Sequence, residues 1–282
     1  MKWQLISPQH AKVEYNQPMT YPRTIAIIQA RMSSSRLPGK VLLDLGGQPA
    51  LAWVIQRARR ARLLSGVLTA TTTDPADDPI AELCARLDTP CFRGHPFDVL
   101  DRYYQAARSA EAEAIIRITA DCPLIDPAQI DELIAAFFEQ SVDFACNRLP
   151  PPWHRTYPIG LDLEMCSFAG LERAWREATL KHEREHVLPY FYDEPGRFKV
   201  LQLNAEADYG HLRWTLDTPA DLEVLRVIFE HFRTQPDFSW RDVLAFWQAN
   251  PQLAERNAAI QHKTMTDVDD RYQPDPGEKL PC

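Results

Sequence analysis

The chain reads Gln29-Ala30-Arg31-Met32-Ser33-Ser34-Ser35-Arg36-Leu37-Pro38-Gly39-Lys40 directly after the short apolar run Thr24 to Ile28. An apolar run of this length, bounded by small and polar residues, predicts a buried strand, and the quoted loop therefore leaves the carboxyl end of that strand. Open α/β sheets bind their ligands at this end. The position of the loop thus indicates a binding site.

The loop places three cations, Arg31, Arg36 and Lys40, around the serine triplet that begins at Ser33. Serine hydroxyl and backbone N–H groups can bind an anion, while arginine forks and the lysine point charge neutralise phosphate. The pattern predicts a triphosphate-binding loop, with a solvated basic turn as the alternative. It is not a P-loop, because that motif needs Ser or Thr after the lysine and Val41 follows here.

This run resembles the signature of the sugar cytidylyltransferases. The resemblance is closest to the branch of the spore coat polysaccharide biosynthesis protein F, which carries the same Q-A-R-M-x-S-x-R-L-P-G-K-V-L run. In that family the loop grips the phosphates of a nucleoside triphosphate. The predicted nucleotide contacts from the loop are Gln29, Ala30, Arg31, Ser33, Ser34, Arg36 and Lys40.

The composition limits the class of protein. A formal charge of −8 over 282 residues argues against general nucleic-acid binding, and an anionic small ligand fits better. The six cysteines show no C-x-x-C spacing, so they indicate neither a zinc site nor an oxidising compartment. No run has the length of a signal-peptide core or a membrane span. We therefore predict a cytoplasmic protein without a membrane partner.

Alternating strands and helices predict a mainly parallel, right-handed α/β sheet. The resemblance, over about residues 24 to 235, implies the glycosyltransferase-A-like nucleotide-binding fold, usually in a homodimer. We divide the chain into an N-terminal extension (1–22), a single nucleotidyltransferase domain (23–261) and a loose C-terminal tail (262–282). A proline-rich segment introduces a predicted acceptor and dimerisation insert at about 148–205.

Two turns after the loop are further candidates for nucleotide contact. The turn that contains Thr72 and Asp74 follows the predicted strand Gly66 to Thr72, and its equivalent in the family lies beside the nucleotide. The segment from Arg93, R-G-x-x-x-D-V-L-D-R-Y, also matches the family, which uses it near the base and acceptor. Asp78 precedes a proline and is predicted to cap a helix.

Asp121 follows the predicted strand Ala114 to Thr119 and has no structural role that the sequence explains. Asp126, by contrast, precedes Pro127 with a glutamine at the third helical position, the pattern of a helix cap. Pro123 would stiffen the turn that aims the Asp121 carboxylate outward. We therefore predict that Asp121 is a metal ligand.

A second strand is predicted to end at Asp217. Thr218, Pro219 and Asp221 follow as a helix cap, a first helical residue and the acid of a capping box. Asp217 lies outside that box, and the L-D-T-P-x-D-L run resembles the family segment that supplies the second metal carboxylate. Sites with one or two carboxylates and phosphate oxygens suit Mg²⁺, the predicted cofactor.

The segment Gly160 to Cys166 alternates between apolar and polar residues, which predicts a half-buried strand. In relatives this G-L-D-x-E segment borders the acceptor pocket, so Asp162 and Glu164 are candidate acceptor contacts. The alternative is that Asp162 and Glu164 are only the polar, solvent-facing residues of this strand and bind no ligand. Ile159 departs from the charged residue common at that position in relatives.

The predicted reaction is attack by a hydroxyl of a sugar or sugar acid on the α-phosphorus of CTP, with release of pyrophosphate, in surface-polysaccharide synthesis. Arg31, Lys40, Asp121 and Asp217 are the predicted catalytic residues. One alternative is a glycosyltransferase that uses a nucleotide sugar, although no D-x-D lies near Asp121. The other is a nucleotide-binding protein without catalytic activity.

Overall fold

The computed structural model describes residues 21–260. The predicted tail at 262–282 and most of the predicted extension at 1–22 lie outside this range. Of the extension, Tyr21 is described, and its ring stacks on Phe138 at a centroid distance of 5.4 Å. None of the helices within 21–260 combines the length and apolar character needed to cross a bilayer.

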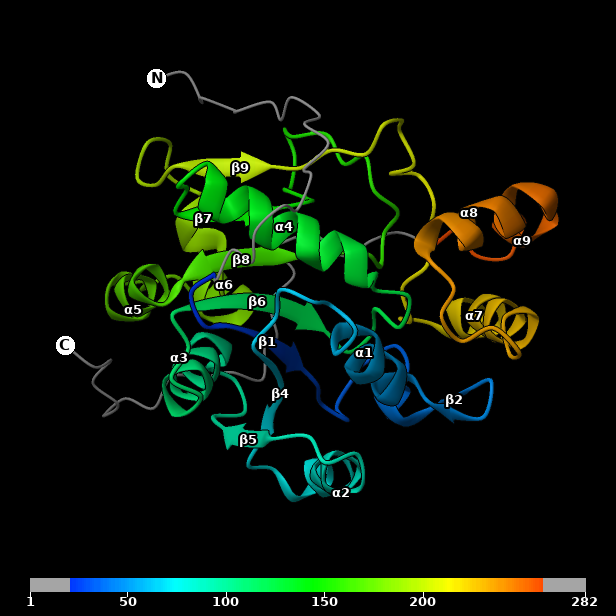
Figure 1. Cartoon of the computed structure of the whole chain (residues 1–282). Coiled ribbons are helices and arrows are strands. Elements are labelled where there is room, and N and C mark those ends of the chain that lie inside the picture. The colour runs from blue at the N-terminus through cyan, green and yellow to red at the C-terminus, as the bar shows by residue number, and fades with distance from the viewer. Residues whose placement is uncertain (1–20, 261–282) are drawn as a thin grey trace.

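A seven-stranded sheet runs through the centre of the molecule (Figure 1). In spatial order its strands are β5 (Cys91–Gly94), β4 (Gly66–Thr72), β1 (Thr24–Gln29), β6 (Ala114–Thr119), β8 (Glu164–Ser167), β7 (Phe144–Cys146) and β9 (Val200–Gln202). Only β8 runs antiparallel to its two neighbours in this sheet. The prediction of a mainly parallel α/β sheet is confirmed.

Helices cover both faces of the sheet because side chains alternate along the buried strands. In β1, Ala26 and Ile28 pack with one core cluster, and Ile25 and Ile27 with the other. The helices of the first cluster are α1 (Ala50–Ala58), α2 (Asp78–Arg86) and α4 (Pro127–Glu139). Those of the second are α3 (Val99–Ser109) and α5 (Phe168–Glu177), with α6 (Lys181–His186) packed on α3.

A third core cluster lies to one side of the sheet, where the last helices pack together (Figure 1). Its elements are α7 (Pro219–His231), α8 (Trp240–Ala249) and α9 (Gln252–Glu255), with the short strand β2 (Asp44–Leu45), which pairs with β3 (Gln48–Pro49). Fully buried Arg57 of α1 links this cluster to the turn before α4. Its guanidinium donates to the carbonyls of Ile125 and Phe238 at 2.7 and 3.1 Å.

Strand β8 differs from its prediction. It begins at Glu164, and Glu164, Met165 and Cys166 are all buried, so the expected half-exposed strand is wrong. The reason is its place between β6 and β7, where Met165 packs into one core cluster and Cys166 into the other. Alternation of residue type in this segment does not reflect exposure to solvent.

The predicted strand ending at Asp217 is also wrong. Within 21–260, this segment forms only an isolated parallel bridge between Arg213 and Ile159. The segment before Asp217 does not pair with a single neighbouring strand. Trp214 N donates to Ile159 O, whereas Leu216 N donates to Asp121 O. Gly160 permits this approach, since its φ is 107° and a Cβ there would lie 2.6 Å from the Trp214 carbonyl carbon.

Candidate active site

The basic loop extends from the carboxyl end of β1 and folds back on itself. The amides of Ser34 and Gly39 both donate to the carbonyl of Met32, each at 2.9 Å. Gly39 has a φ of 69°, a conformation that glycine adopts without strain, and Lys40 follows as the first residue of the 3₁₀ helix η1 (Lys40–Leu42). The loop therefore has a defined shape that presents Lys40 from its end.

Asp77 holds this loop to the neighbouring strand. Its buried carboxylate accepts the amide of Met32 at 2.7 Å and the amide of Thr72 at 3.3 Å, together with the Thr72 hydroxyl. Asp77 was not predicted as a functional residue, because the Asp78-Pro79 pair that follows it has the pattern of a helix cap. The only local signal was an additional acid in a short turn after a strand.

Asp78 itself does not cap α2, so that prediction is wrong. The helix already begins at Asp78, whose carboxylate pairs with Arg93 at 2.7 Å. Arg93 also donates to the carbonyls of Thr72 and Asp74, each at 2.9 Å, while the Asp74 side chain caps the 3₁₀ helix η2 (Pro75–Asp77). These groups hold the turn together, and nucleotide contact by Thr72, Asp74 and Arg93 stays a prediction.

Replacement of Asp77 by alanine is expected to lower the free energy of unfolding by about 2 kcal/mol, because buried donors lose their acceptor. It is also expected to weaken nucleotide binding, because the loop loses its attachment to β4. Asp78→Ala is the matched control, because it removes the carboxylate of the neighbouring residue, which forms a half-exposed ion pair with Arg93. Its loss is expected to cost under about 1 kcal/mol. Urea unfolding and nucleotide titration measure both variants, and equal losses would contradict the anchoring role.

The two predicted metal carboxylates meet at Lys40. The Lys40 Nζ lies 2.6 Å from Oδ2 of Asp121 and 2.8 Å from Oδ1 of Asp217. Asp121 follows β6, and its other oxygen accepts the Thr119 hydroxyl at 2.6 Å. The structure thus brings together three of the four predicted catalytic residues, although they are far apart in sequence.

Further cations surround Asp217. Arg36 lies 3.0 Å from its Oδ1, and Arg213 lies 3.0 Å from its Oδ2. Burial alone would raise the pKa of Asp217, but Lys40, Arg36 and Arg213 outweigh it and lower the pKa below the ordinary value. Burial would likewise lower the pKa of Lys40, yet Asp121 and Asp217 raise it. Asp217 and Lys40 are therefore both charged at neutral pH.

Asp217 is held in place by the capping box that follows it, because its amide donates to the Asp221 carboxylate at 3.1 Å. Thr218 and Asp221 form the predicted box at the start of α7, and the fully buried Asp221 carboxylate also binds Arg213 at 2.9 and 3.0 Å. The amide of Leu216 donates to the main-chain carbonyl of Asp121 at 2.8 Å. Main-chain contacts therefore fix the spacing of the two metal-ligand candidates.

A cavity of about 200 Å³ joins the loop to these carboxylates. The predicted residues that line it are Gln29, Arg31, Ser34, Arg36, Lys40, Asp121 and Asp217. Ala30 and Ser33 are not among its lining residues. The Ala30 amide instead donates to the carbonyl of Ala70 in β4 at 3.1 Å, which extends the pairing of β1 with β4.

A second cavity, of about 120 Å³, shares Gln29 and Arg31 with the first. Its basic lining residues are Arg31, Arg117, Lys181 and Arg184, with His186 beside them and Glu185 as its acid. The sequence analysis did not propose Arg117 or Arg184 for the site. The segment from Arg184 continues the family pattern, but only the topology, which brings α6 to the end of β1, places it at this cavity.

The two candidate acceptor contacts already have arginine partners. Glu164 is buried and pairs with Arg117 at 2.5 Å, and another nitrogen of Arg117 lies 3.5 Å from the Gln29 side chain. Asp162 receives Arg155 Nη2 at 2.9 Å and Arg148 Nε at 3.3 Å. Acceptor contact by either carboxylate stays a prediction.

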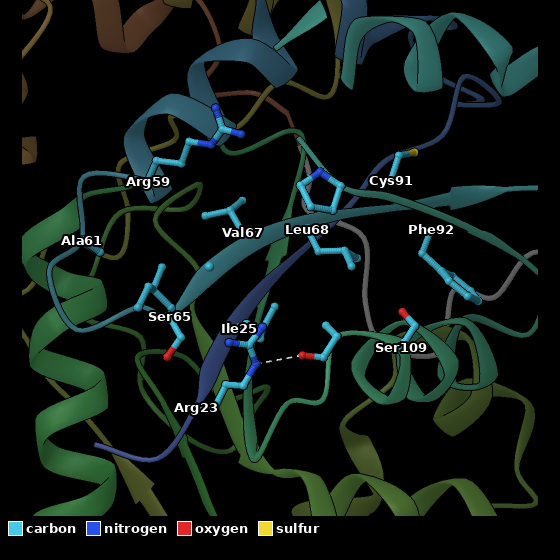
Figure 2. A pocket seen from close by; sticks show the side chains of 14 residues that line it. Arg23, Ile25, Arg59, Ala61, Ser65, Val67, Leu68, Cys91, Phe92 and Ser109 are labelled. Carbon is cyan, nitrogen blue, oxygen red and sulfur yellow. Dashed lines mark hydrogen bonds between the residues drawn. The ribbon is translucent and has the colours of Figure 1, made fainter. Parts of the chain in front are cut away.

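A larger cavity, of about 660 Å³, lies at the opposite end of the strands (Figure 2). Arg23, Ser65 and Phe92 are among the residues around it, and Arg23 Nε donates to the Ala110 carbonyl at 2.9 Å. It borders the amino ends of β1 and β4, whereas the loop and Asp121 follow the carboxyl ends of β1 and β6. This cavity is separate from the candidate active site.

The donor set fits Mg²⁺ bound together with a phosphate-bearing ligand. Within residues 21–260 no group of three or more His, Cys, Asp or Glu side chains is placed to hold a metal. Asp121 and Asp217 nevertheless direct one oxygen each at the same cation, Lys40 Nζ. Magnesium is held in such sites by one or two carboxylates, waters and substrate phosphates.

Comparison with known proteins identifies the family. Residues 25–238 match the family described as cytidylyltransferase. The spore coat polysaccharide biosynthesis protein SpsF of Bacillus subtilis is 30% identical over 83% of this chain and 97% of its own length. An uncharacterized protein of Methanocaldococcus jannaschii is 34% identical over 88% of this chain and 100% of its own.

A solved cytidylyltransferase from Leptospira borgpetersenii is similar in both sequence and structure. It is 31% identical, with a TM-score of 0.79, and the match covers 86% of this chain and 100% of that chain. The extent of these matches decides the family: the chain is a nucleotidyltransferase that belongs to the cytidylyltransferase family.

Proposed function

We propose that the protein transfers CMP from CTP to a hydroxyl group of a sugar or sugar acid and releases pyrophosphate. The observation that carries this proposal is the single cavity in which Arg31, Arg36 and Lys40 face Asp121 and Asp217. Cations suit a triphosphate, and paired carboxylates suit its metal ion. Membership of the cytidylyltransferase family supports CTP as the nucleotide.

In the proposed reaction the acceptor oxygen forms a bond to the α-phosphorus of CTP. The bond between that phosphorus and the α–β bridging oxygen breaks, pyrophosphate leaves, and the hydroxyl proton passes to solvent. Arg31 and Arg36 line the cavity on the loop side and would bind the phosphate oxygens on which negative charge grows. Positioning and charge stabilisation carry such transfers, so no nucleophilic side chain is required.

Asp121 and Asp217 would hold Mg²⁺ through their carboxylate oxygens, with phosphate and water completing its coordination. When bound, Mg²⁺ supplies positive charge that stabilises the α-phosphate oxygens during the transfer. The chain contributes the orientation of the two carboxylates. Thr119 orients Asp121, and Arg213 orients Asp217.

The second cavity is the proposed acceptor pocket, because it adjoins the first at Gln29 and Arg31. Its four basic lining residues outnumber the carboxylates around them, since Glu185 lines the cavity and Glu164 and Asp98 pair with Arg117 and Arg184. This excess of positive charge favours an acceptor that carries a carboxylate. Glu164 would act there through Arg117, whose side chain it positions. Asp162 and its partner Arg155 do not line this cavity, and Asp162 would contact the acceptor from outside it.

We further propose a role in the synthesis of a surface polysaccharide or glycan, in the cytoplasm, by a homodimer that uses the segment at about 148–205. The name of the Bacillus subtilis relative, which refers to spore coat polysaccharide, supports the pathway for this chain. Gel filtration with light scattering tests the dimer.

The first experiment is a thermal-shift titration with CTP, ATP, GTP and UTP, each with and without Mg²⁺. A ligand at about a hundred times its Kd stabilises the fold by roughly 2.7 kcal/mol, which is readily detected. We expect selective, magnesium-dependent stabilisation by CTP, followed by pyrophosphate release when sugar acids are added. No shift with any triphosphate would overturn the proposal, stabilisation by nucleotide sugars alone would favour a glycosyltransferase, and binding without turnover would favour a non-catalytic protein.

A further inference from the structure

Lys40 lies at the point where the two metal-ligand candidates converge. Its Nζ is within hydrogen-bond distance of both carboxylates, at 2.6 Å from Asp121 and 2.8 Å from Asp217, and its side chain is only 12% exposed. A lysine at the mouth of the cavity whose only role is to bind phosphate would be more exposed to solvent. The ammonium is instead a cation enclosed by the site itself.

A divalent ion and this ammonium cannot share the position. Magnesium lies about 2.0 to 2.1 Å from its carboxylate oxygens, so an ion held by both carboxylates would overlap the space that Nζ fills. The two cations would also repel each other at such short range. Lys40 must therefore withdraw before both carboxylates can bind the same metal ion.

The surroundings of Lys40 allow this exchange. Lysine is a point charge on a flexible stem, so Nζ can move while the loop keeps its backbone in place. Asp121 retains its hydrogen bond to Thr119, and Asp217 retains Arg36 and Arg213. Both carboxylates would stay oriented without the lysine.

We infer that Lys40 is an internal counter-ion that competes with the metal for Asp121 and Asp217 and is released by the incoming triphosphate. The inference rests on the proposed function, because it takes these carboxylates as the metal site. The triphosphate offers the displaced ammonium new anionic partners on the same loop. Metal and nucleotide therefore each strengthen the binding of the other, as linkage requires.

The test measures Mn²⁺ binding to the nucleotide-free protein, with Mn²⁺ alone as the probe, by electron paramagnetic resonance. We expect Lys40→Met to bind Mn²⁺ at least about tenfold more tightly than the wild type, within the usual range of such couplings. Lys40→Gln keeps N–H donors for the carboxylates without the charge, so it serves if the methionine variant does not fold. Melting curves verify folding in each case.

Two controls locate the effect. Lys199→Met removes an exposed lysine that binds main-chain carbonyls at Gln140 and Ser141, and it is expected to leave Mn²⁺ affinity unchanged. Adding Asp121→Asn to the Lys40 variant is expected to abolish the gain. These controls separate competition at the carboxylates from a general change in net charge.

Equal or weaker Mn²⁺ binding by the folded Lys40 variants would overturn the inference. If the wild type still released pyrophosphate from CTP in a magnesium-dependent reaction, the proposed function would stand and only the counter-ion role would fall. If neither wild type nor variant bound Mn²⁺ in the presence or absence of CTP, the metal site of the proposed function would be wrong, and this inference with it.

Discussion

Replacement of Asp121 by asparagine is expected to lower kcat for pyrophosphate release roughly a thousandfold, equivalent to about 4 kcal/mol of transition-state stabilisation. The amide keeps the shape of the side chain and can still accept the Thr119 hydroxyl, but it removes one of two charges directed at the metal position. The KM for CTP is expected to rise by a smaller factor than kcat falls, because Arg31 and Arg36 still bind the phosphates and only the coupling to the metal is lost. Steady-state kinetics over a range of Mg²⁺ concentrations measures both parameters.

Asp143→Asn is the matched control for this substitution. Asp143 is exposed, and its carboxylate accepts the Lys199 amide at 2.7 Å near the amino end of β7, away from the loop. The control makes the same change of charge and is expected to leave kcat unchanged. Near-normal turnover by Asp121→Asn would show that the two-carboxylate metal site is wrong.

The second large effect is on stability. Asp221→Ala is expected to lower the free energy of unfolding by about 3 to 5 kcal/mol, because buried Arg213 loses one of its two carboxylate partners and other buried donors lose their acceptor. The Asp221 carboxylate is fully buried and accepts hydrogen bonds from Arg213, Asn257 and the backbone of Thr218. Chemical denaturation, with activity followed in parallel, measures the loss.

Asp242→Ala provides the comparison, since Ser239 and Asp242 form the same capping box at the start of α8 but on the surface. Its loss is expected to cost about 1 kcal/mol, the usual value of a cap. A similar loss for both variants would contradict the role of the buried charge pair at α7.

The stability that Asp221 contributes also depends on pH. Burial would raise its pKa, but Arg213, Asn257 and Thr218 lower it below the ordinary value in the folded protein. The contribution is therefore complete above the unfolded-state pKa of about 3.9 and is lost as the pH falls below it. Wild type and variant should approach each other in stability only in that acidic range.

Much of the framework was predictable because local patterns determine it. The buried strand before Gln29 and the strand Ala114–Thr119 follow from short apolar runs, and both place a functional residue at a carboxyl end. The cap at Asp126 and the capping box at Asp221 follow from proline and acid spacing that is typical of helix starts. Such signals depend on a few adjacent residues.

The predictions failed where partners come from distant parts of the chain. The exposure of β8 depends on its neighbours β6 and β7, and the segment before Asp217 takes its hydrogen bonds from Ile159 and Asp121. The loop analysis assigned Lys40 to phosphate alone, since no sequence spacing shows that two aspartates enclose it. The anchor at Asp77 was hidden for the same reason, because its partner Met32 lies in another turn.

The main-chain bond between Leu216 and Asp121 has a consequence for synthesis of the chain. A ribosome completes the basic loop, β1, β4 and β6 long before it reaches Asp217, and contacts of such sequence separation form late. A nascent chain can therefore have its phosphate loop and Asp121 in place while the second carboxylate does not yet exist. Catalytic activity would then appear only after most of the protein has been made. A truncated product that ends before Asp217 would be inactive however well its first half folds.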